Sequence, residues 1–378
     1  MANISDISRD QWMLTGPLAT KGFDWWWHSF TAVNAKTGKR RGFFIEFFTC
    51  NPGLAQDESV IVWNDDEKYK EGVRPSYLMV KVGFWGKKHA QLHRFFPWKD
   101  VQIKKGVPFY IAADDCSLSE THTRGSVVVT ESDVAAHPEW MCDTGQMTWN
   151  LQIRKKVAFH VGYGADGFFR KMNSFEMFWH AEGMKTEYSG EIILNGVRYL
   201  VEPKNCNGYA DKNWGGDFTS PWVWLSSNQL WSKKYGRKLE NSVFDIGGGR
   251  PKIYHLALDK RLLGELYYEG QDYEFNFSKF WTRSTTKFRC YETEDAICWK
   301  IVQKTRFAEL DTEVSCPKEE MLLVNYESPD GRKRHNRLWN GGTGKGRLKL
   351  YRRDLLGRRK LVDVIYAKEI GCEYGEYE

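Results

Sequence analysis

Residues 207–218 read Asn-Gly-Tyr-Ala-Asp-Lys-Asn-Trp-Gly-Gly-Asp-Phe, and residues 221–225 continue with Pro-Trp-Val-Trp-Leu. The glycines allow tight turns or a close approach of the backbone to another group. The stretch also holds two carboxylates, a phenol, an amide and an indole, which fit poorly together unless a site uses them. The other interpretation is a turn between strands, rich in Gly, Asn and Asp, with one buried Trp. The stretch alone leaves both interpretations open.

A second stretch far upstream has the same aromatic and acidic character. Residues 23–30 read Phe-Asp-Trp-Trp-Trp-His-Ser-Phe. They belong to a predicted pair of strands over 25–34 and 41–49, which are joined by a turn. A stretch of this kind upstream strengthens the interpretation of 207–218 as part of a site.

Alternation across the first of these strands separates its side chains into two sets. Asp24, Trp26 and His28 share one face, while Trp25 and Trp27 share the other. Both faces are rich in aromatic residues. We therefore expect one face to line an interior and the other to pack under a second layer.

The returning strand places a carboxylate between two phenylalanines. Phe44, Glu46 and Phe48 share a face. Burial between aromatic rings would raise the pKa of Glu46 and make it a candidate acid. The alternative is that Glu46 pairs with an arginine or is hydrogen-bonded to a neighbour.

The pattern Gly-Tyr-x-Asp-x-Asn-Trp-Gly, followed by Trp-x-Trp, resembles the tocopherol cyclase family and its relatives, the carotenoid 1,2-hydratases and the AttH-like two-domain lipocalin-fold proteins. The resemblance is strongest over 208–225 and looser over 23–48 and 176–202. It implies an all-β, mostly antiparallel chain with two lipocalin-like (calycin) β-barrel domains and a few short helices. It also implies a cyclase or hydratase, of the isomerase or lyase class, that protonates an alkene carbon while aromatic faces stabilise a tertiary cation.

The resemblance implies roles for the motif residues. Asp211 is the expected proton donor, Tyr209 would orient or share its proton, and His180 would be the hydrogen-bonding partner. Lys212 departs from the hydratase pattern and would favour an ionised Asp211. In that case Glu46 or Asp24 would be the better donor.

The expected substrate contacts come from the same stretches. Trp26, Trp179 and Trp214 are candidate walls facing the cation, and Asn213 is expected to fix the loop or a substrate oxygen. The complete predicted set is Asp24, Trp26, His28, Trp179, Asn213, Trp214, Trp222 and Trp224.

The length of 378 residues favours two domains. The second half restarts in pattern, because 222–224 echo the aromatic run at 25–27 and strand-like stretches near 346–366 echo those at 190–202. We predict an N-terminal lipocalin-like domain over 1–205, a linking motif loop over 206–218 and a C-terminal lipocalin-like domain over 219–378.

The aromatic share of 15%, with 17 Trp, favours β-rich structure around large apolar interiors. Composition and pattern alone indicate a binder or an enzyme for a large apolar molecule. The family implies a prenylated, terpenoid or steroid-like substrate. The alternative function is a non-catalytic carrier or sensor of hydrophobic small molecules. A third is an isomerase or lyase that uses the same acid without cyclisation.

Charge and cysteine patterns limit the partners. The net charge is +6, and its basic residues gather over 332–360. A solvated hairpin surface is favoured there, with peripheral association to an anionic membrane surface as the alternative. Nucleic acid is not expected, because no aromatic-interleaved binding motif accompanies the charge. The eight cysteines contain no Cys-x-x-Cys pair, so we expect free thiols, no metal and no cofactor. The oligomeric state stays open.

No apolar run has the length of a membrane-spanning helix, and residues 1–11 lack a hydrophobic signal core. We therefore expect a cytoplasmic protein. Residues 162–167 match G-x-G-x-x-G and precede a predicted helix over 168–179. A dinucleotide site is not expected, because the chain lacks the βαβ alternation that such a site needs.

Overall fold

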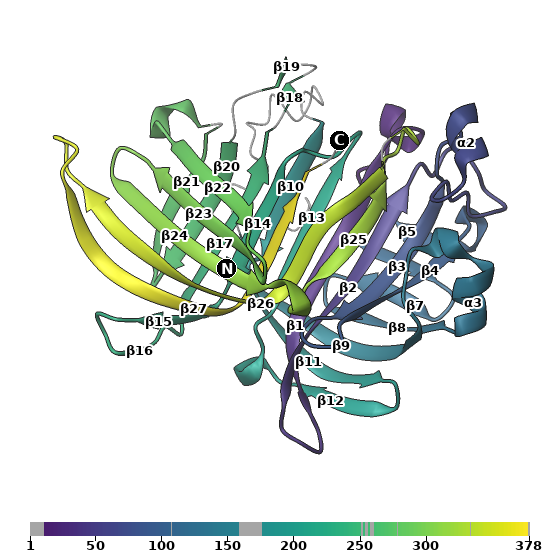
Figure 1. Ribbon diagram of the computed structural model, residues 1–378, viewed down its shortest axis with the longest axis horizontal. Coiled ribbons are helices and arrows are strands. Elements are labelled where there is room, and N and C mark those ends of the chain that lie inside the picture. The colour runs from purple at the N-terminus through teal and green to yellow at the C-terminus, as the bar shows by residue number, and fades with distance from the viewer. Residues whose placement is uncertain are drawn as a thin grey trace.

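Antiparallel strands make up nearly all of the computed structural model, which describes residues 11–106, 108–158, 176–250, 252–253, 256–257, 261–277, 279–332 and 334–376. The strands form two large curled sheets, which stand side by side in Figure 1, and one small two-stranded sheet. The predicted all-β, mostly antiparallel, lipocalin-like fold class is confirmed. All eight cysteines are free thiols.

The first sheet holds thirteen strands from the N-terminal half of the chain. Their bounds are β1 (Phe23–Asn34), β2 (Arg40–Cys50), β3 (Tyr77–Phe84), β4 (Ala90–Phe96), β5 (Val101–Lys104), β6 (Tyr110–Ala113), β7 (Cys116–Ser119), β8 (His122–Val129), β9 (Gly145–Val157), β10 (Met177–Gly183), β11 (Lys185–Leu194), β12 (Val197–Val201) and β13 (Tyr209–Gly215). The main hydrogen-bonded order is β4-β3-β2-β1-β12-β11-β9-β8-β7-β6-β5, and β13 pairs with both β1 and β10. The predicted strands at 25–34 and 41–49 are β1 and β2.

Arg94 joins the two ends of this strand order. From β4, its guanidinium donates to Asp115 at 2.7 Å and to the backbone oxygen of Ser126 at 3.2 Å. It also pairs with Asp114. Side chains on β4 thus reach the β6–β8 end of the sheet, and the sheet curls around an apolar interior.

The second sheet holds twelve strands. Their bounds are β14 (Trp222–Ser227), β15 (Gln229–Ser232), β16 (Arg237–Lys238), β17 (Ser242–Gly249), β20 (Arg261–Tyr268), β21 (Gln271–Phe275), β22 (Thr285–Glu292), β23 (Ala296–Lys304), β24 (Ala308–Pro317), β25 (Leu322–Glu327), β26 (Arg334–Arg353) and β27 (Arg359–Gly375). The main order is β21-β20-β17-β14-β27-β26-β24-β23-β22, and β18 (Lys252–Ile253) pairs with β19 (Leu256–Ala257) in the small sheet.

The central stretch is a strand of the first sheet rather than the linking loop expected over 206–218. In β13, residues 209–215 pair with β1 on one side, and part of the strand pairs with β10 on the other. Both neighbours supply hydrogen bonds, so Asn213 and Gly215 are held extended despite the preference of these residue types for turns. The division into domains at 1–205 and 219–378 stays a prediction.

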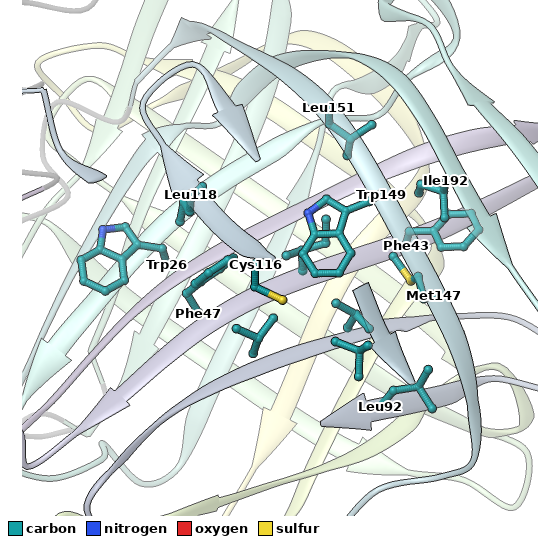
Figure 2. Packing of buried hydrophobic residues seen from close by; sticks show 14 of the residues in the cluster. Trp26, Phe43, Phe47, Leu92, Cys116, Leu118, Met147, Trp149, Leu151 and Ile192 are labelled. Carbon is teal, nitrogen blue, oxygen red and sulfur yellow. The ribbon is translucent and has the colours of Figure 1, made fainter. Parts of the chain in front are cut away.

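Alternation along the strands divides the buried side chains into three layers. Inside the first sheet, Trp26 and Trp149 belong to one apolar core, which Figure 2 shows from close by. Inside the second sheet, Trp299 belongs to another. The third layer joins the two sheets and includes Trp27 of β1 and Trp224 of β14. The two aromatic faces predicted for β1 therefore line an interior and an inter-sheet layer.

Helices are short throughout the described residues. The α-helices are α2 (Asp66–Glu71) and α3 (Glu131–Ala136), and the 3-10 helices are η1 (Gly16–Ala19), η2 (Trp98–Asp100), η3 (Pro138–Trp140), η4 (Pro203–Asn205), η5 (Phe280–Thr282) and η6 (Lys318–Glu320). Among the residues that the structure describes, no helix is long and apolar enough to cross a membrane. The Gly-rich match at 162–167 lies outside the described residues, as does most of the predicted helix over 168–179, whose end is strand β10.

A buried ion pair joins β1 to β13 inside the first sheet. Lys212 Nζ contacts Asp24 Oδ1, and both side chains are fully buried. Removing one partner of such a pair leaves the other charge without compensation. We expect Lys212→Met to lower the free energy of unfolding by about 3–5 kcal/mol in urea titrations.

The loss should be smaller at pH 5 than at pH 8. Burial raises the pKa of Asp24 to about 6 even with Lys212 beside it, so an unpaired Asp24 takes up a proton more readily at low pH. Lys36→Met, on an exposed turn, is the control. A loss below about 1 kcal/mol in Lys212→Met, the range of an exposed ion pair, would contradict the structural role of this pair.

Candidate active site

A pocket lies in the layer between the two sheets. The pocket is narrow, with a cavity volume of about 20 Å³. Its walls come from β1, β10 and β13 of the first sheet and from β14, β25, β26 and β27 of the second. The lining residues are Trp25, Trp27, Met177, Asp211, Asn213, Trp222, Trp224, Tyr326, Leu338 and Glu373.

Asp211 projects from β13 into this pocket and accepts three hydrogen bonds. Trp179 Nε1 donates at 2.7 Å, Tyr209 OH at 3.2 Å and Asn213 Nδ2 at 3.4 Å. All three donors reach the same oxygen, Oδ2. A proton on this carboxyl is therefore expected on Oδ1, which these donors do not contact.

A second buried carboxyl, Asp245 of β17, is connected to Asp211 through Tyr209 and Trp224. Trp224 Nε1 lies 3.1 Å from Tyr209 OH and 3.1 Å from Asp245 Oδ1, and it donates to both. Tyr209 comes from the first sheet and Trp224 from the second. The two side chains thus connect carboxyl groups that belong to different sheets.

Burial raises the pKa of both aspartates well above the ordinary value. For Asp211 the hydrogen bond from Trp179 opposes this effect and the charge of Glu373 adds to it. For Asp245 the charge of Asp211 adds to the effect of burial. Two carboxyls in one desolvated site do not both ionise readily. Burial therefore favours the neutral carboxylic acid in this site, which is the form that can donate a proton.

Glu373 of β27 is the other carboxyl that lines the pocket. Its Oε2 accepts from Trp222 Nε1 at 2.6 Å, and its Oε1 accepts from Asn340 Nδ2 at 2.5 Å. Asn340 Oδ1 accepts in turn from Trp85 Nε1 at 2.7 Å, which fixes the orientation of the amide. Burial raises the pKa of Glu373 to about 7. This carboxyl can therefore give or take a proton at neutral pH.

Two glycines make room for the indoles that hold this network. A Cβ at Gly371 would lie 2.4 Å from the ring of Trp224, and a Cβ at Gly247 would lie 3.0 Å from the ring of Trp179. Both distances are closer than an ordinary contact. Any larger side chain would therefore displace an indole whose N–H group bonds to the site.

Glu46, the alternative donor expected from the sequence, is held in an ion pair. Lys81 Nζ lies 3.0 Å from its Oε2, and Tyr326 OH donates to both carboxylate oxygens at 3.0 and 3.1 Å. Burial raises the pKa of Glu46, and the charge of Lys81 opposes that rise. The interpretation of Glu46 as a paired group is the one found, with a lysine in place of an arginine.

The lysine that follows Asp211 does not contact it. Because side chains alternate along β13, Lys212 points to the opposite face and pairs with Asp24. Its ammonium lies 4.1 Å from the ring of Trp26 and 5.4 Å from that of Trp214. Trp26 and Trp214 thus lie on the side of Lys212, away from the inter-sheet pocket in which Asp211 lies. Asp24 likewise lies away from the pocket.

The two predicted histidines also lie on that opposite face. The register pairs His180 with Lys212, so its side chain points away from Asp211 and the predicted hydrogen bond between them is wrong. His28 Nδ1 lies 2.8 Å from Tyr188 OH, and burial lowers the pKa of His28 to about 4. Of the predicted residues, the structure brings Tyr209, Trp179, Asp211, Asn213, Trp222 and Trp224 together.

Asp245 and Glu373 were missed by the sequence analysis. Asp245 is a lone carboxylate on its face of β17, where it alternates with Val243, Gly247 and Gly249, and this period-2 pattern was the available signal. Glu373 had no such signal, because Asp363 and Glu369 also occupy alternate positions of β27. No group of three or more potential ligands for a metal ion is found among the described residues.

Comparisons with known proteins support the family that residues 208–225 resemble. A family model described as tocopherol cyclase-like matches residues 109–375. The chloroplastic tocopherol cyclase of Zea mays is 34% identical over 104 residues, which is 27% of this chain and 20% of that relative. An AttH candidate of Nitrosomonas europaea has a TM-score of 0.44 and 14% identity, covering 92% of each chain. Kievitone hydratase of Nectria haematococca has a TM-score of 0.48 and 9% identity, covering 94% of this chain and 89% of that one.

The packing of Trp224 on Gly371 gives a stability prediction. In Gly371→Ala the new methyl group must displace the indole, which pulls its N–H group away from Tyr209 and Asp245. We expect a loss of about 1–3 kcal/mol in the free energy of unfolding. The near-ultraviolet circular dichroism of the tryptophans should change as well. Gly216→Ala, whose new Cβ would lie 3.5 Å from the nearest atom, should leave both unchanged. Equal behaviour of the two variants would count against the tight packing.

Proposed function

The chain belongs to the tocopherol cyclase-like family, and we propose that it is an enzyme that protonates a carbon–carbon double bond of a large apolar substrate. The substrate is prenylated, terpenoid or steroid-like, and the outcome is cyclisation, hydration or isomerisation. One observation carries the proposal. The described contacts of Asp211 in the inter-sheet pocket are indole, phenol and amide donors rather than a cation, and burial keeps its pKa high.

The first step transfers the proton of Asp211 to an alkene carbon. The π electrons of the double bond form the new C–H bond, and the more substituted carbon becomes a cation. Trp179 and Tyr209 then stabilise the aspartate left behind, because their N–H and O–H groups already point at its Oδ2. These donors do not need to reorient as the charge develops, which lowers the barrier.

Aromatic faces around the pocket stabilise the cation. Trp25 and Trp27 come from β1, and Trp222 and Trp224 come from β14. Indole rings are the strongest cation–π partners among the side chains, and the interaction is larger where water is excluded. These four indoles take the role that the sequence analysis had given in part to Trp26 and Trp214.

Glu373 accepts the second proton. In cyclisation a substrate hydroxyl attacks the cation, and in hydration a water molecule does so. The C–O bond forms and the oxygen loses a proton, which Glu373 takes as carboxylate. Release of this proton to solvent and uptake of another by Asp211 restore the starting state. Asn340 and Trp222 hold Glu373 through separate oxygens, so its position is fixed.

Two polar atoms near the pocket can orient the substrate. Among the described residues, Trp27 Nε1 and Asn213 Oδ1 are buried without a hydrogen-bond partner, and both residues line the pocket. Such groups are rare in folded proteins and call for an explanation. One is a donor and the other an acceptor, so together they suit a hydroxyl group, which both accepts and donates, on an otherwise apolar molecule.

A deuterium experiment tests the reaction class. A prenylated hydroquinone and a prenylated phenol are incubated with the protein in deuterium oxide, and the products are examined by mass spectrometry. Protonation of an alkene places one deuterium on carbon in either product. Binding of both compounds without conversion would instead favour the non-catalytic carrier.

Asp211→Asn tests the proton donor. We expect the variant to keep its melting temperature and its affinity for the converted compound, because the amide has the same shape. Turnover should fall by about a hundredfold or more, the scale of losing a general acid. Single-turnover rates are measured beside a melting curve, with Asp217→Asn, outside the pocket, as the matched control. Full activity in Asp211→Asn would falsify the assignment.

The two carboxyls predict a bell-shaped pH dependence of kcat/KM. Activity requires an ionised Glu373, so it should rise with pH through about 7. It should fall again at a higher pH where Asp211 loses its proton. In Glu373→Gln the acidic limb should disappear and turnover should fall by about ten- to a hundredfold. An unchanged acidic limb in this variant would show that another group takes the second proton.

A further inference from the structure

The outer end of the second sheet exposes large apolar side chains. Leu355 and Leu356 are 76% and 78% exposed in the turn between β26 and β27, and Trp281 and Phe307, on nearby turns, are 62% and 61% exposed. Figure 1 shows the β26–β27 hairpin curving away from the first sheet to the edge of the molecule. Contiguous exposed apolar groups of this kind mark interaction sites. The inter-sheet pocket does not use them.

Backbone hydrogen bonds hold three turns together at this end. Arg353 N donates to Phe307 O at 2.8 Å, and Arg306 N donates to Thr282 O at 3.4 Å. The turns therefore form one surface, which we name the distal rim. It consists of residues 281–283, 305–307 and 352–361.

The two leucines stand at the tip of a tight turn. Asp354 N donates to Arg358 O at 3.0 Å, and Gly357 has a φ of 79°, which a residue with a side chain rarely adopts. Arg358 Nε also pairs with Asp354 Oδ2 at 2.8 Å. These bonds keep the turn closed. Leu355 and Leu356 therefore protrude as a fixed pair.

The distal rim is strongly basic. Its basic residues are Arg283, Arg306, Arg352, Arg353, Arg358, Arg359 and Lys360. The nearby acids are fewer: Asp354 pairs with Arg358, Glu309 pairs with Arg359 at 2.7 Å, and Asp272 and Glu274 line a hollow beside Phe307. The surface therefore carries a net positive charge around its apolar tip.

We infer that the distal rim docks the protein on a lipid bilayer that contains anionic headgroups, with Leu355 and Leu356 inserted among the acyl chains. Basic side chains around an apolar insertion are the combination that holds a protein at such a surface. Trp281 suits the headgroup level, where indoles are enriched. The inference does not depend on the proposed reaction.

The shape of the tip favours a bilayer over a protein partner. Leu355 and Leu356 stand exposed in the β26–β27 turn, and a protein partner would need a matching pocket for them. A bilayer accepts any small apolar projection, and its anionic headgroups complement the net positive charge of the distal rim. An apolar substrate of the proposed kind would also be found in such a bilayer.

Vesicle flotation of the full-length protein tests the inference. Vesicles of phosphatidylcholine alone are compared with vesicles that also contain phosphatidylglycerol. We expect binding to the anionic vesicles, weakening as salt is raised. Leu355→Ser with Leu356→Ser should weaken this binding by about tenfold or more. Leu323→Ser, at an exposed leucine of β25, is the matched control and should bind as the natural protein does.

A variant with fewer basic residues separates the insertion of the leucines from the electrostatic attraction between the distal rim and the anionic headgroups. Arg352→Gln with Lys360→Gln should reduce binding to anionic vesicles while the leucines remain. The inference is overturned if the natural protein binds neither vesicle or if the serine variant binds as tightly as the natural protein. It is also overturned if the leucines instead hold a dimer. In that case sedimentation would show a dimer for the natural protein and a monomer for the serine variant, and the natural protein would not bind vesicles. Circular dichroism confirms that each variant is folded.

Discussion

Burial of carboxyl groups between two apolar sheets is the constraint on which this structure depends. Asp211 and Asp245 lie where aromatic side chains take the place of water, and burial raises the pKa of each well above the ordinary 3.8. In the folded chain the two carboxyls therefore hold their protons to a higher pH than in the unfolded chain. As a consequence, their contribution to stability is present at low pH and is lost as pH rises from 3.8 through the folded pKa. The same feature gives the pocket a neutral acid.

Strand alternation keeps Lys212 away from Asp211. On β13, Tyr209 and Asp211 face the inter-sheet pocket while Lys212 faces the interior of the first sheet. A shift of one residue in the register would exchange these faces and place an ammonium beside the acid. Pairing with β1 on one side and β10 on the other fixes the register. The raised pKa of Asp211 thus depends on the pairing of β13 with β1 and β10 as much as on the hydrogen bonds of its own side chain.

The family resemblance implied the fold class and part of the site, and local pattern predicted strands β1 and β2. Alternation was sufficient to predict β1, because aromatic residues on both of its faces mark it as a buried strand without knowledge of its partners. It failed for β13, because the glycines in and beside this strand are typical of a turn and its extended form depends on two distant partners. His180 was predicted beside Asp211, but the pairing of β10 with β13 places its side chain on the opposite face. Asp245 and Glu373 were missed because they reach the site from the second sheet. Local sequence pattern does not predict which strands face each other across a pocket.

The most direct test is the pKa of Asp211. Aspartate side-chain carbons are labelled with carbon-13, and the Asp211 resonance is assigned by its absence from Asp211→Asn. We expect this resonance to stay at the position of a protonated carboxyl through pH 7, while exposed aspartates titrate near their ordinary value. Titration of Asp211 near 3.8 would contradict the account, because an ionised carboxylate cannot protonate a double bond.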